Sequence, residues 1–240
     1  MPKLRVALAD RQRIADGTYA FTLDLKGQPF PYKAGQTVDL TYADMPRSDA
    51  AGNKRTFSIA SSPGRGSIVV ATRDRGSAFK RSLIEAPIGT ELEADGPYGS
   101  FTLPNKPAHA VLLAGGIGVT PFRAMAEDAI ERSLEHTLTL IHSNRTPEET
   151  PFLLELLNWA TKNDRFEYKP TMTRPERSKK GWKGERRRVE AAALREWLPK
   201  GGASVHYVAG PERFVKGATE ALRGAGVDED LIRAEEFPGY

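Results

Sequence analysis

A glycine-rich turn after the most apolar stretch of the chain is the sharpest chemical signal in the sequence. The run 110–114 leads into Gly115, Gly116 and Gly118, and a helical pattern opens at Thr120. Glycines let a ligand approach the backbone, and the free N–H groups at a helix start attract an anion. The spacing fits neither the G-x-G-x-x-G fingerprint nor a Walker A loop. The segment therefore predicts either a phosphate-binding turn of another type or a tight strand–helix connection.

The strand-like segment Arg55-Thr56-Phe57-Ser58 is a second candidate for ligand binding. Alternate side chains of a strand share a face, so Arg55 and Phe57 point one way and Ser58 the other. A ligand lying along this strand would meet a positive charge suited to phosphate, an aromatic ring and, across the backbone, a hydroxyl group.

A basic segment carries the largest local charge. Between Arg174 and Arg188 the sequence has eight Lys or Arg and two Glu, more net positive charge than the +4 of the whole chain. Such a run is typical of an electrostatic contact with phosphate or with an acidic partner. Trp182 is its only aromatic residue and it has no recognition-helix pattern, so nucleic acid is the least favoured partner. A solvated loop and a docking surface for an acidic electron-transfer protein are the alternatives.

The composition excludes several kinds of chemistry. The 240 residues include no cysteine, which rules out disulfides, Cys-ligated zinc, a cysteine nucleophile and a Cys-held iron–sulfur cluster. The four histidines show no ligand spacing, so we expect no metal site. The sequence contains neither a signal-like apolar core nor an apolar run of membrane-spanning length, which predicts a cytoplasmic protein without membrane contact.

The elements that must position these residues change in rhythm along the chain. The first hundred residues indicate a sandwich or small barrel, with a helix near 77–86 and short strands separated by turn residues at 18–25, 37–42, 55–60, 67–72 and 91–94. After the Pro-rich link 104–107, strands alternate with helices, which predicts a parallel sheet covered on both faces. The strands are expected at 110–114, 137–142, 166–171, 204–209 and 232–237, and the helices at 120–133, 148–162, 189–197 and 211–223.

Four motifs, in order, resemble those of the ferredoxin–NADP reductase superfamily of FAD-dependent oxidoreductases. The R-x-Y/F-S strand matches Arg55–Ser58, the G-P-x-G turn matches Gly96–Gly99, the G-G-x-G-x-T-P loop matches Gly115–Pro121 and the C-G-P turn matches Ala209–Pro211. The resemblance covers essentially the whole chain. It implies an antiparallel six-stranded β-barrel that binds FAD, at residues 1–105, followed by a doubly wound parallel-sheet domain that binds NAD(P), at residues 106–240.

The resemblance implies roles for the first strand motif. Arg55 would neutralise the FAD pyrophosphate through a charge-assisted contact. Phe57 would pack against the flavin, and the Ser58 hydroxyl would lie near flavin N5, the atom that accepts hydride. Thr56 belongs to the same cofactor-binding strand.

Two further segments would complete the FAD site. Gly76 and Ser77 would offer backbone N–H groups to the pyrophosphate, and Lys80 is the side chain expected to assist them. At the other end of the chain, Glu235 resembles the carboxylate that family members place near the flavin. Tyr240 resembles a terminal aromatic ring that covers the isoalloxazine, and the resemblance leaves open which of the two lies on the ring.

The dinucleotide would bind at the carboxyl ends of the parallel strands. The residues expected there are Gly115, Gly116, Gly118, Thr120, Arg145, Thr173, Arg174, Gly210 and Pro211. Thr120 would lie near the nicotinamide. Thr173 and Arg174 match the hydroxyl–arginine pair that holds the 2′-phosphate in NADP-dependent relatives, so NADPH is favoured over NADH.

The expected function is that of a flavoenzyme which takes hydride from NADPH, with Ser58, Thr120 and Glu235 as its catalytic residues. Without cysteine there is no fused plant-type iron–sulfur domain, so electrons would leave to a separate acceptor such as a ferredoxin, a flavodoxin or an oxygenase component. One alternative is a flavin reductase that uses free flavin as its substrate. Another is an electron-relay module without dehydrogenase activity, an idea supported by Ala209, which replaces the family's usual cysteine.

Overall fold

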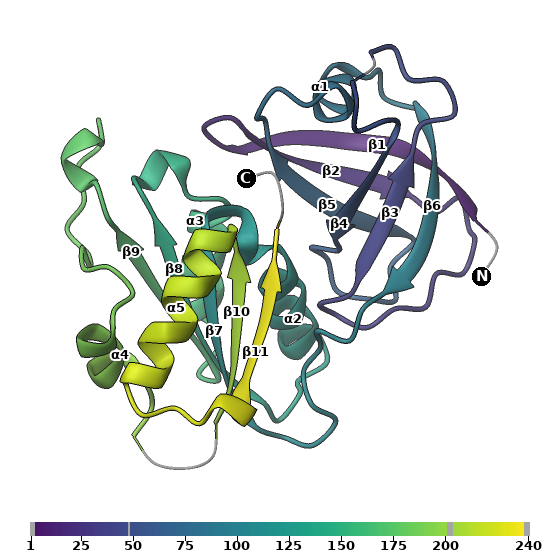
Figure 1. Cartoon of the computed structure of the whole chain (residues 1–240). Helices are drawn as coiled ribbons and strands as arrows, with labels where there is room; N and C mark the ends of the chain where they lie inside the picture. Colours follow the sequence, from purple (N-terminus) through teal and green to yellow (C-terminus); the bar gives the residue numbers. More distant parts are fainter. Residues whose placement is uncertain (1–2, 48, 201–203, 238–240) are drawn as a thin grey trace.

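Six antiparallel strands form the amino-terminal unit of the structure, a computed structural model that describes residues 3–47, 49–200 and 204–237 (Figure 1). The strands are β1 (Leu4–Ala15), β2 (Thr18–Asp24), β3 (Thr37–Thr41), β4 (Lys54–Ser58), β5 (Ser67–Arg73) and β6 (Glu91–Tyr98). Their spatial order is β4-β3-β6-β1-β2-β5. An antiparallel bridge between Ile59 and Val70 joins the two outer strands, so the sheet closes into the predicted barrel.

Helix α1 (Ala78–Glu85) packs its apolar face against the barrel core. Phe79 is fully buried, and its ring lies 5.2 Å from that of Tyr42 and 5.9 Å from that of Phe57, measured between ring centroids. Because Phe57 belongs to β4, these contacts fix the start of α1 next to the strand that carries Arg55.

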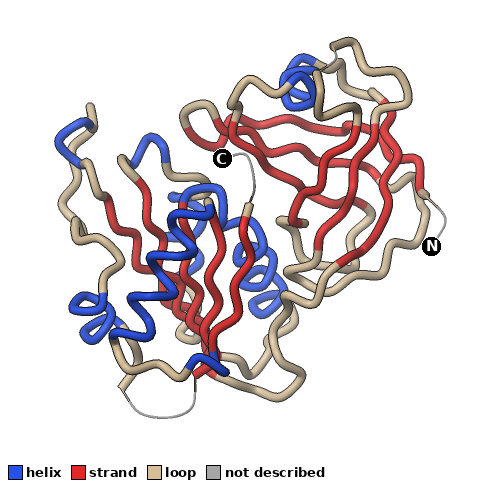
Figure 2. Tube along the Cα trace, in the orientation of Figure 1, coloured by secondary structure: helices blue, strands red, loops and turns tan. Residues whose placement is uncertain are grey.

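The second unit is a five-stranded parallel sheet covered by helices (Figures 1 and 2). In chain order it consists of β7 (His109–Gly115), α2 (Thr120–Glu131), β8 (Thr137–Asn144), α3 (Leu153–Ala160), β9 (Phe166–Met172), α4 (Ala191–Trp197), β10 (Ser204–Gly210), α5 (Glu212–Gly224) and β11 (Ile232–Glu236). The strand order is β11-β10-β7-β8-β9. A short 3₁₀ turn, Gly116–Val119, links β7 directly to α2.

Alternate side chains of β7 enter two separate cores, as a doubly wound sheet requires. Leu112 and Ala114 pack in the cluster that holds the apolar faces of α2 and α3. Val111 and Leu113 pack in the cluster formed with α4 and α5 on the opposite face. The near-continuous apolar run that predicted a buried strand is therefore confirmed, together with the fold class.

The helix predicted over 148–162 is shorter than its sequence pattern suggested. A 3₁₀ turn at Pro147–Glu149 is followed by an extended Thr150, and α3 begins only at Leu153. Pro151 explains the break, because a proline disfavours helical geometry in the residue before it. Phe152 takes a left-handed conformation with φ 58°, which completes the interruption.

The two units pack closely against each other. Tyr207 of β10 donates a hydrogen bond to the Thr102 carbonyl at 2.8 Å, and its ring lies edge-on to Phe101 at 5.3 Å. Arg73 of β5 forms an ion pair with Glu149 beyond β8. Within the described ranges no helix is long and apolar enough to cross a membrane.

Candidate functional site

A cavity of about 600 Å³ lies between the two units. Its walls come from β4, the start of α1, the start of α2 and the end of β11. Of the residues that the sequence singled out, eight line it: Arg55, Thr56, Phe57, Ser58, Ser77, Lys80, Thr120 and Glu235. The tertiary structure thus brings together residues that are up to 180 positions apart in the chain.

Ser58 and Thr120 reach the cavity from different units of the fold. Ser58 is the last residue of β4, where it pairs with Thr37 of β3, and only 7% of it is exposed. Thr120 opens α2, and its hydroxyl donates to the Ile117 carbonyl at 3.1 Å, which ties the helix to the 3₁₀ turn before it. Two residues with hydroxyl side chains, one from each unit, therefore line the same cavity.

Arg55 and the start of α1 form a cradle for an anion. The Arg55 guanidinium lies 3.1 Å from an oxygen of Asp49 and donates to Ser77 Oγ at 3.2 Å. The same carboxylate accepts a hydrogen bond from the Ala78 N–H at 2.8 Å. Hydrogen bonds from the Ala78 N–H, then from the Ala51 N–H and from Arg55, hold the pKa of Asp49 below its usual value. A negative charge therefore already lies where a positive side chain and a helix start converge, and this geometry fits the pyrophosphate of FAD.

We expect Asp49→Asn to lower the dissociation constant for FAD by about tenfold. Asp49 competes with the pyrophosphate for Arg55 and for the Ala78 N–H, and an amide competes less than a carboxylate. Fluorescence titration of the apoprotein with FAD measures the change. Asp44→Asn removes another exposed carboxylate close by in the sequence and serves as the control. Unchanged or weaker FAD binding in Asp49→Asn would contradict competition.

Gly76 is placed beside the cavity but is not among its lining residues. It has φ +88°, and its N–H donates to Asp74 Oδ1 at 2.8 Å, so this donor already has a partner within the turn. Lys80, by contrast, is 7% exposed and lines the cavity. Gly76 therefore shapes the turn that starts α1, whereas Ser77 and Lys80 line the cavity wall.

Glu235 brings an unusual carboxyl group into the cavity. It lies on β11 beside Ala209 of β10, and its Oε2 is buried without a hydrogen-bond partner among the described residues. Burial raises the pKa of Glu235 to about 7. This carboxyl can therefore hold or release a proton near neutral pH, in the cavity that Ser58 and Thr120 also line.

The raised pKa of Glu235 makes stability depend on pH with a defined sign. Between the usual value of 4.5 and about 7 the folded state binds more protons than the unfolded state, so stability falls as pH rises through this window. Relative to wild type, Glu235→Gln should gain about 2 kcal/mol of unfolding free energy between pH 4.5 and pH 8. Urea unfolding at both pH values measures it, with the exposed Glu236→Gln as control. Parallel pH profiles for wild type and Glu235→Gln would refute the assignment.

The glycines in and around the turn after β7 are required for different structural reasons. A Cβ on Gly118 would lie 2.2 Å from the Ala209 carbonyl oxygen, and one on Gly115 would lie 2.5 Å from the Phe214 ring. Gly210, with φ +150°, packs in the same way against the Gly115 backbone. These three residues let the turns after β7 and β10 pack together. Gly116, with φ +55° and nothing nearer than 4.0 Å to its missing Cβ, is the one that leaves open space for a ligand.

His142 and Asn144 lie beside this turn and were not among the predicted site residues. His142 is fully buried, with Nε2 2.8 Å from the Gly116 carbonyl and Nδ1 3.0 Å from the Tyr168 hydroxyl. Burial lowers its pKa to about 4, so the neutral ring donates to Gly116 and accepts from Tyr168. Asn144 Nδ2 is a buried donor that has no hydrogen-bond partner within the described part of the chain. The only signal in the sequence was their place near the end of a buried strand.

The predicted 2′-phosphate residues come together at the ends of β8 and β9. The Arg174 N–H donates to the Arg145 carbonyl at 2.9 Å, and the Thr173 hydroxyl donates to the Asn144 carbonyl at 3.1 Å. Arg145 and Arg174 are both exposed, and within the described part of the chain neither guanidinium has an ion-pair partner. Pro211 directly precedes α5 at the end of β10.

Two further expectations from the sequence concern the terminal Tyr240 and the absence of a metal site. Tyr240 lies outside the described residues. Across residues 3–47, 49–200 and 204–237, no group of three or more His, Asp or Glu could hold a metal ion.

Comparisons with known proteins support the fold and the family that the motifs suggested. A family model described as an oxidoreductase NAD-binding domain matches residues 112–220. The ferredoxin–NADP reductase B of Sorangium cellulosum is 32% identical over 221 residues, which cover 88% of this chain and 87% of that protein. The glycine betaine monooxygenase reductase subunit of Chromohalobacter salexigens is 29% identical over 92% of this chain, which spans 60% of that protein.

Solved structures share the fold at lower identity. The cytochrome P450 reductase GcoB of Amycolatopsis has a TM-score of 0.80 at 22% identity, with 98% of this chain and 70% of that chain covered. The cytochrome b5 reductase domain of Ulva prolifera nitrate reductase has a TM-score of 0.81 at 18% identity, with 98% and 97% covered. The chain therefore belongs to the ferredoxin–NADP reductase family of FAD-dependent NAD(P)H oxidoreductases.

Proposed function

We propose that this protein is a reductase that oxidises NADPH and passes the electrons, through bound FAD, to a separate acceptor protein. The observation that carries the proposal is the cavity between the two units, which gathers Arg55, Ser58, Thr120 and Glu235. In this proposal residues 1–105 bind FAD and residues 106–240 bind the dinucleotide.

Each side of the cavity has a separate task. Arg55, Ser77 and the first N–H groups of α1 bind the pyrophosphate, and Phe57 packs beside the flavin. FAD, when bound, supplies the redox chemistry. Ser58 and Thr120 orient the reacting rings from opposite units, and Glu235 holds a proton at its buried Oε2. The protein contributes binding and geometry rather than a nucleophile.

The preference for NADPH follows from the ends of β8 and β9. Arg145 and Arg174 place two exposed positive charges at neighbouring strand ends, and Thr173, directly before Arg174, adds a hydroxyl group. A free 2′-hydroxyl is usually held by a carboxylate, whereas a 2′-phosphate calls for arginine. We therefore assign NADPH as the preferred donor over NADH.

The acceptor is proposed from chemistry and from the relatives together. The chain has no cysteine with which to hold an iron–sulfur cluster, so the electrons must leave to another redox centre. The relatives include a ferredoxin–NADP reductase and the reductase subunit of a monooxygenase. A ferredoxin, a flavodoxin or an oxygenase component is the class of partner we propose.

An absorbance spectrum, followed by anaerobic titration, tests the function. We expect a yellow protein that retains FAD through gel filtration and is bleached by NADPH at lower concentrations than by NADH. A colourless protein that fails to bind added FAD would refute the proposal. Turnover of free flavin by a protein that loses FAD on the column would identify a flavin reductase instead. FAD binding without bleaching would identify an electron-relay module.

A further inference from the structure

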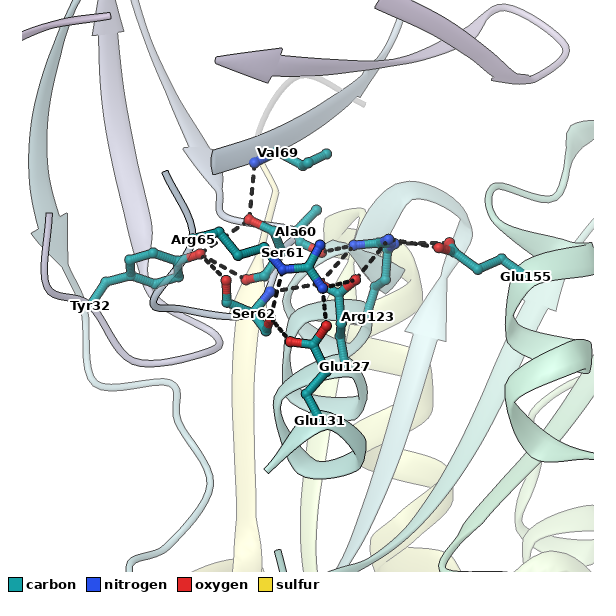
Figure 3. A network of polar contacts seen from close by, with 10 residues as sticks. All are labelled: Tyr32, Ala60, Ser61, Ser62, Arg65, Val69, Arg123, Glu127, Glu131 and Glu155. Carbon is teal, nitrogen blue, oxygen red and sulfur yellow. Dashed lines mark hydrogen bonds and ion pairs between the residues drawn. The ribbon is translucent and has the colours of Figure 1, made fainter. Parts of the chain in front are cut away.

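Arg123 of α2 makes a buried link between the two units (Figure 3). Its Nη1 donates to the Ala60 carbonyl of the barrel, while Nε and Nη2 donate to the Glu155 carboxylate at 2.9 and 2.7 Å. Only 8% of Arg123 is exposed. A buried guanidinium needs such partners, because an unpaired charge in this environment is strongly destabilising.

The orientation of the Arg123 side chain is fixed on every side. Its guanidinium lies over the rings of Phe152 and Trp159, at 5.0 and 5.2 Å from their centroids, and Glu127 lies 3.3 Å away one turn along the helix. Phe152 is the residue with the left-handed conformation that delays the start of α3. The interrupted helix therefore presents a ring and, through Glu155, a carboxylate to the same guanidinium.

A second set of contacts reinforces the link from the neighbouring turn of α2. The Ser62 N–H donates to Glu127 Oε2 at 2.7 Å, and Arg65 forms ion pairs with Glu127 and Glu131. Figure 3 shows the barrel segment 60–65 held along one face of α2 by these groups. Arg123, Glu127 and Glu131 are spaced four residues apart, so they lie on one face of the helix.

The two ends of this link lie close in the sequence to Ser58 and Thr120, which line the cavity. Ala60 follows Ser58 by two residues and is held where the barrel closes, with its N–H donating to the Val69 carbonyl at 2.7 Å. Arg123 follows Thr120 by three residues, within the first turn of the same helix. A shift of α2 relative to β4 would therefore change the separation of Ser58 and Thr120 directly.

We propose that Arg123 is a positioning residue, which sets how the Thr120 side of the cavity faces the Ser58 side by holding α2 against the Ala60 carbonyl. The proposal rests on the proposed function only for its kinetic consequence. Arg123 is not among the residues that line the cavity, so it acts on geometry and not on binding. Misplacement of reacting groups by about 1 Å costs on the order of 100-fold in rate.

The test combines kinetics with a distance measurement on the FAD-loaded protein. For Arg123→Met we expect kcat with NADPH to fall by about 100-fold, with the dissociation constant for FAD and the KM for NADPH each changed by less than about threefold. Because the chain has no native cysteine, Ile88→Cys and Lys216→Cys can carry spin labels on the exposed surface of each unit. We expect their distance distribution to broaden in Arg123→Met.

Two further variants keep the test decisive. Arg123→Lys retains the buried charge but cannot reach Ala60 and Glu155 together, so we expect an intermediate loss of kcat, about tenfold. This variant carries the test if Arg123→Met fails to fold. Arg132→Met removes an exposed arginine that directly follows α2 and pairs with Asp128 of that helix. This control should change neither kcat nor the distance distribution. An unchanged distance distribution and kcat in both Arg123 variants would overturn the proposal. Failure of the wild type to oxidise NADPH would refute the proposed function instead, and the distance arm would still report on Arg123.

Discussion

Arg55→Ala is expected to raise the dissociation constant for FAD by about 50-fold, a loss of about 2.3 kcal/mol. The Arg55 guanidinium contacts both Asp49 and Ser77, the residue before the first turn of α1, and its side chain is only 17% exposed. Contacts between an arginine and a phosphate that are shielded from water are stronger than those in solvent. Titration of the apoprotein with FAD, followed by flavin fluorescence, measures the effect.

The control for Arg55 is Arg47→Ala. Arg47 lies in the connection between β3 and β4, but its exposed side chain pairs with Glu85 at the far end of α1. Exposed ion pairs contribute little, so FAD affinity should stay within about twofold of wild type. The Asp49→Asn variant should shift affinity in the opposite direction from Arg55→Ala. An Arg55→Ala protein that binds FAD as tightly as wild type would show that the pyrophosphate lies elsewhere.

Arg174→Ala is expected to lower kcat/KM for NADPH by about 30-fold and to leave kcat/KM for NADH within about twofold. Arg174 is exposed and next to the backbone of Arg145, so its charge is available to a phosphate but screened by salt. The loss should therefore shrink as ionic strength rises. Steady-state kinetics with both donors at two salt concentrations measure it.

Lys183→Ala separates a specific contact from general attraction. Lys183 is an exposed residue of the same basic segment, nine positions further along the chain. A specific 2′-phosphate contact leaves the donor preference of Lys183→Ala unaltered. Equal losses in the two variants, or an unaltered preference in Arg174→Ala, would contradict the assignment and would favour a docking role for the basic segment.

The structure also explains part of the charge that the sequence concentrates at 174–188. Arg187 pairs with Glu185 and Glu196 and lies over the Trp197 ring, so it stabilises the loop rather than a ligand. Arg186 donates to the Trp182 carbonyl. The residues nearest the strand ends, Arg174 above all, are the ones left for a phosphate.

The order and type of the elements could be predicted from the sequence because they depend on local patterns. The apolar run of β7, the proline at the start of α2 and the turn residues between the barrel strands each act over a few positions. The motifs around Ser58 and Thr120 are local too, so the sequence alone also pointed to the strand and the helix start that line the cavity. The helix predicted over 148–162 was too long, because its apolar periodicity suggested a helix that extends through Pro151, whereas α3 begins at Leu153.

Only the tertiary structure decided what these residues meet. Three of the turn glycines fit because another backbone or ring lies against them, and the carboxyl of Glu235 is shifted because folding buries it without a partner. The Ala78 N–H reaches Asp49, and Arg123 reaches Ala60, across 29 and 63 positions of the chain, and no local pattern encodes either contact. The sequence by itself determined the elements and the chemistry they carry, because propensity and periodicity are short-range properties. Burial, close approach and pairing depend on long-range contacts, so only the folded chain determined the site.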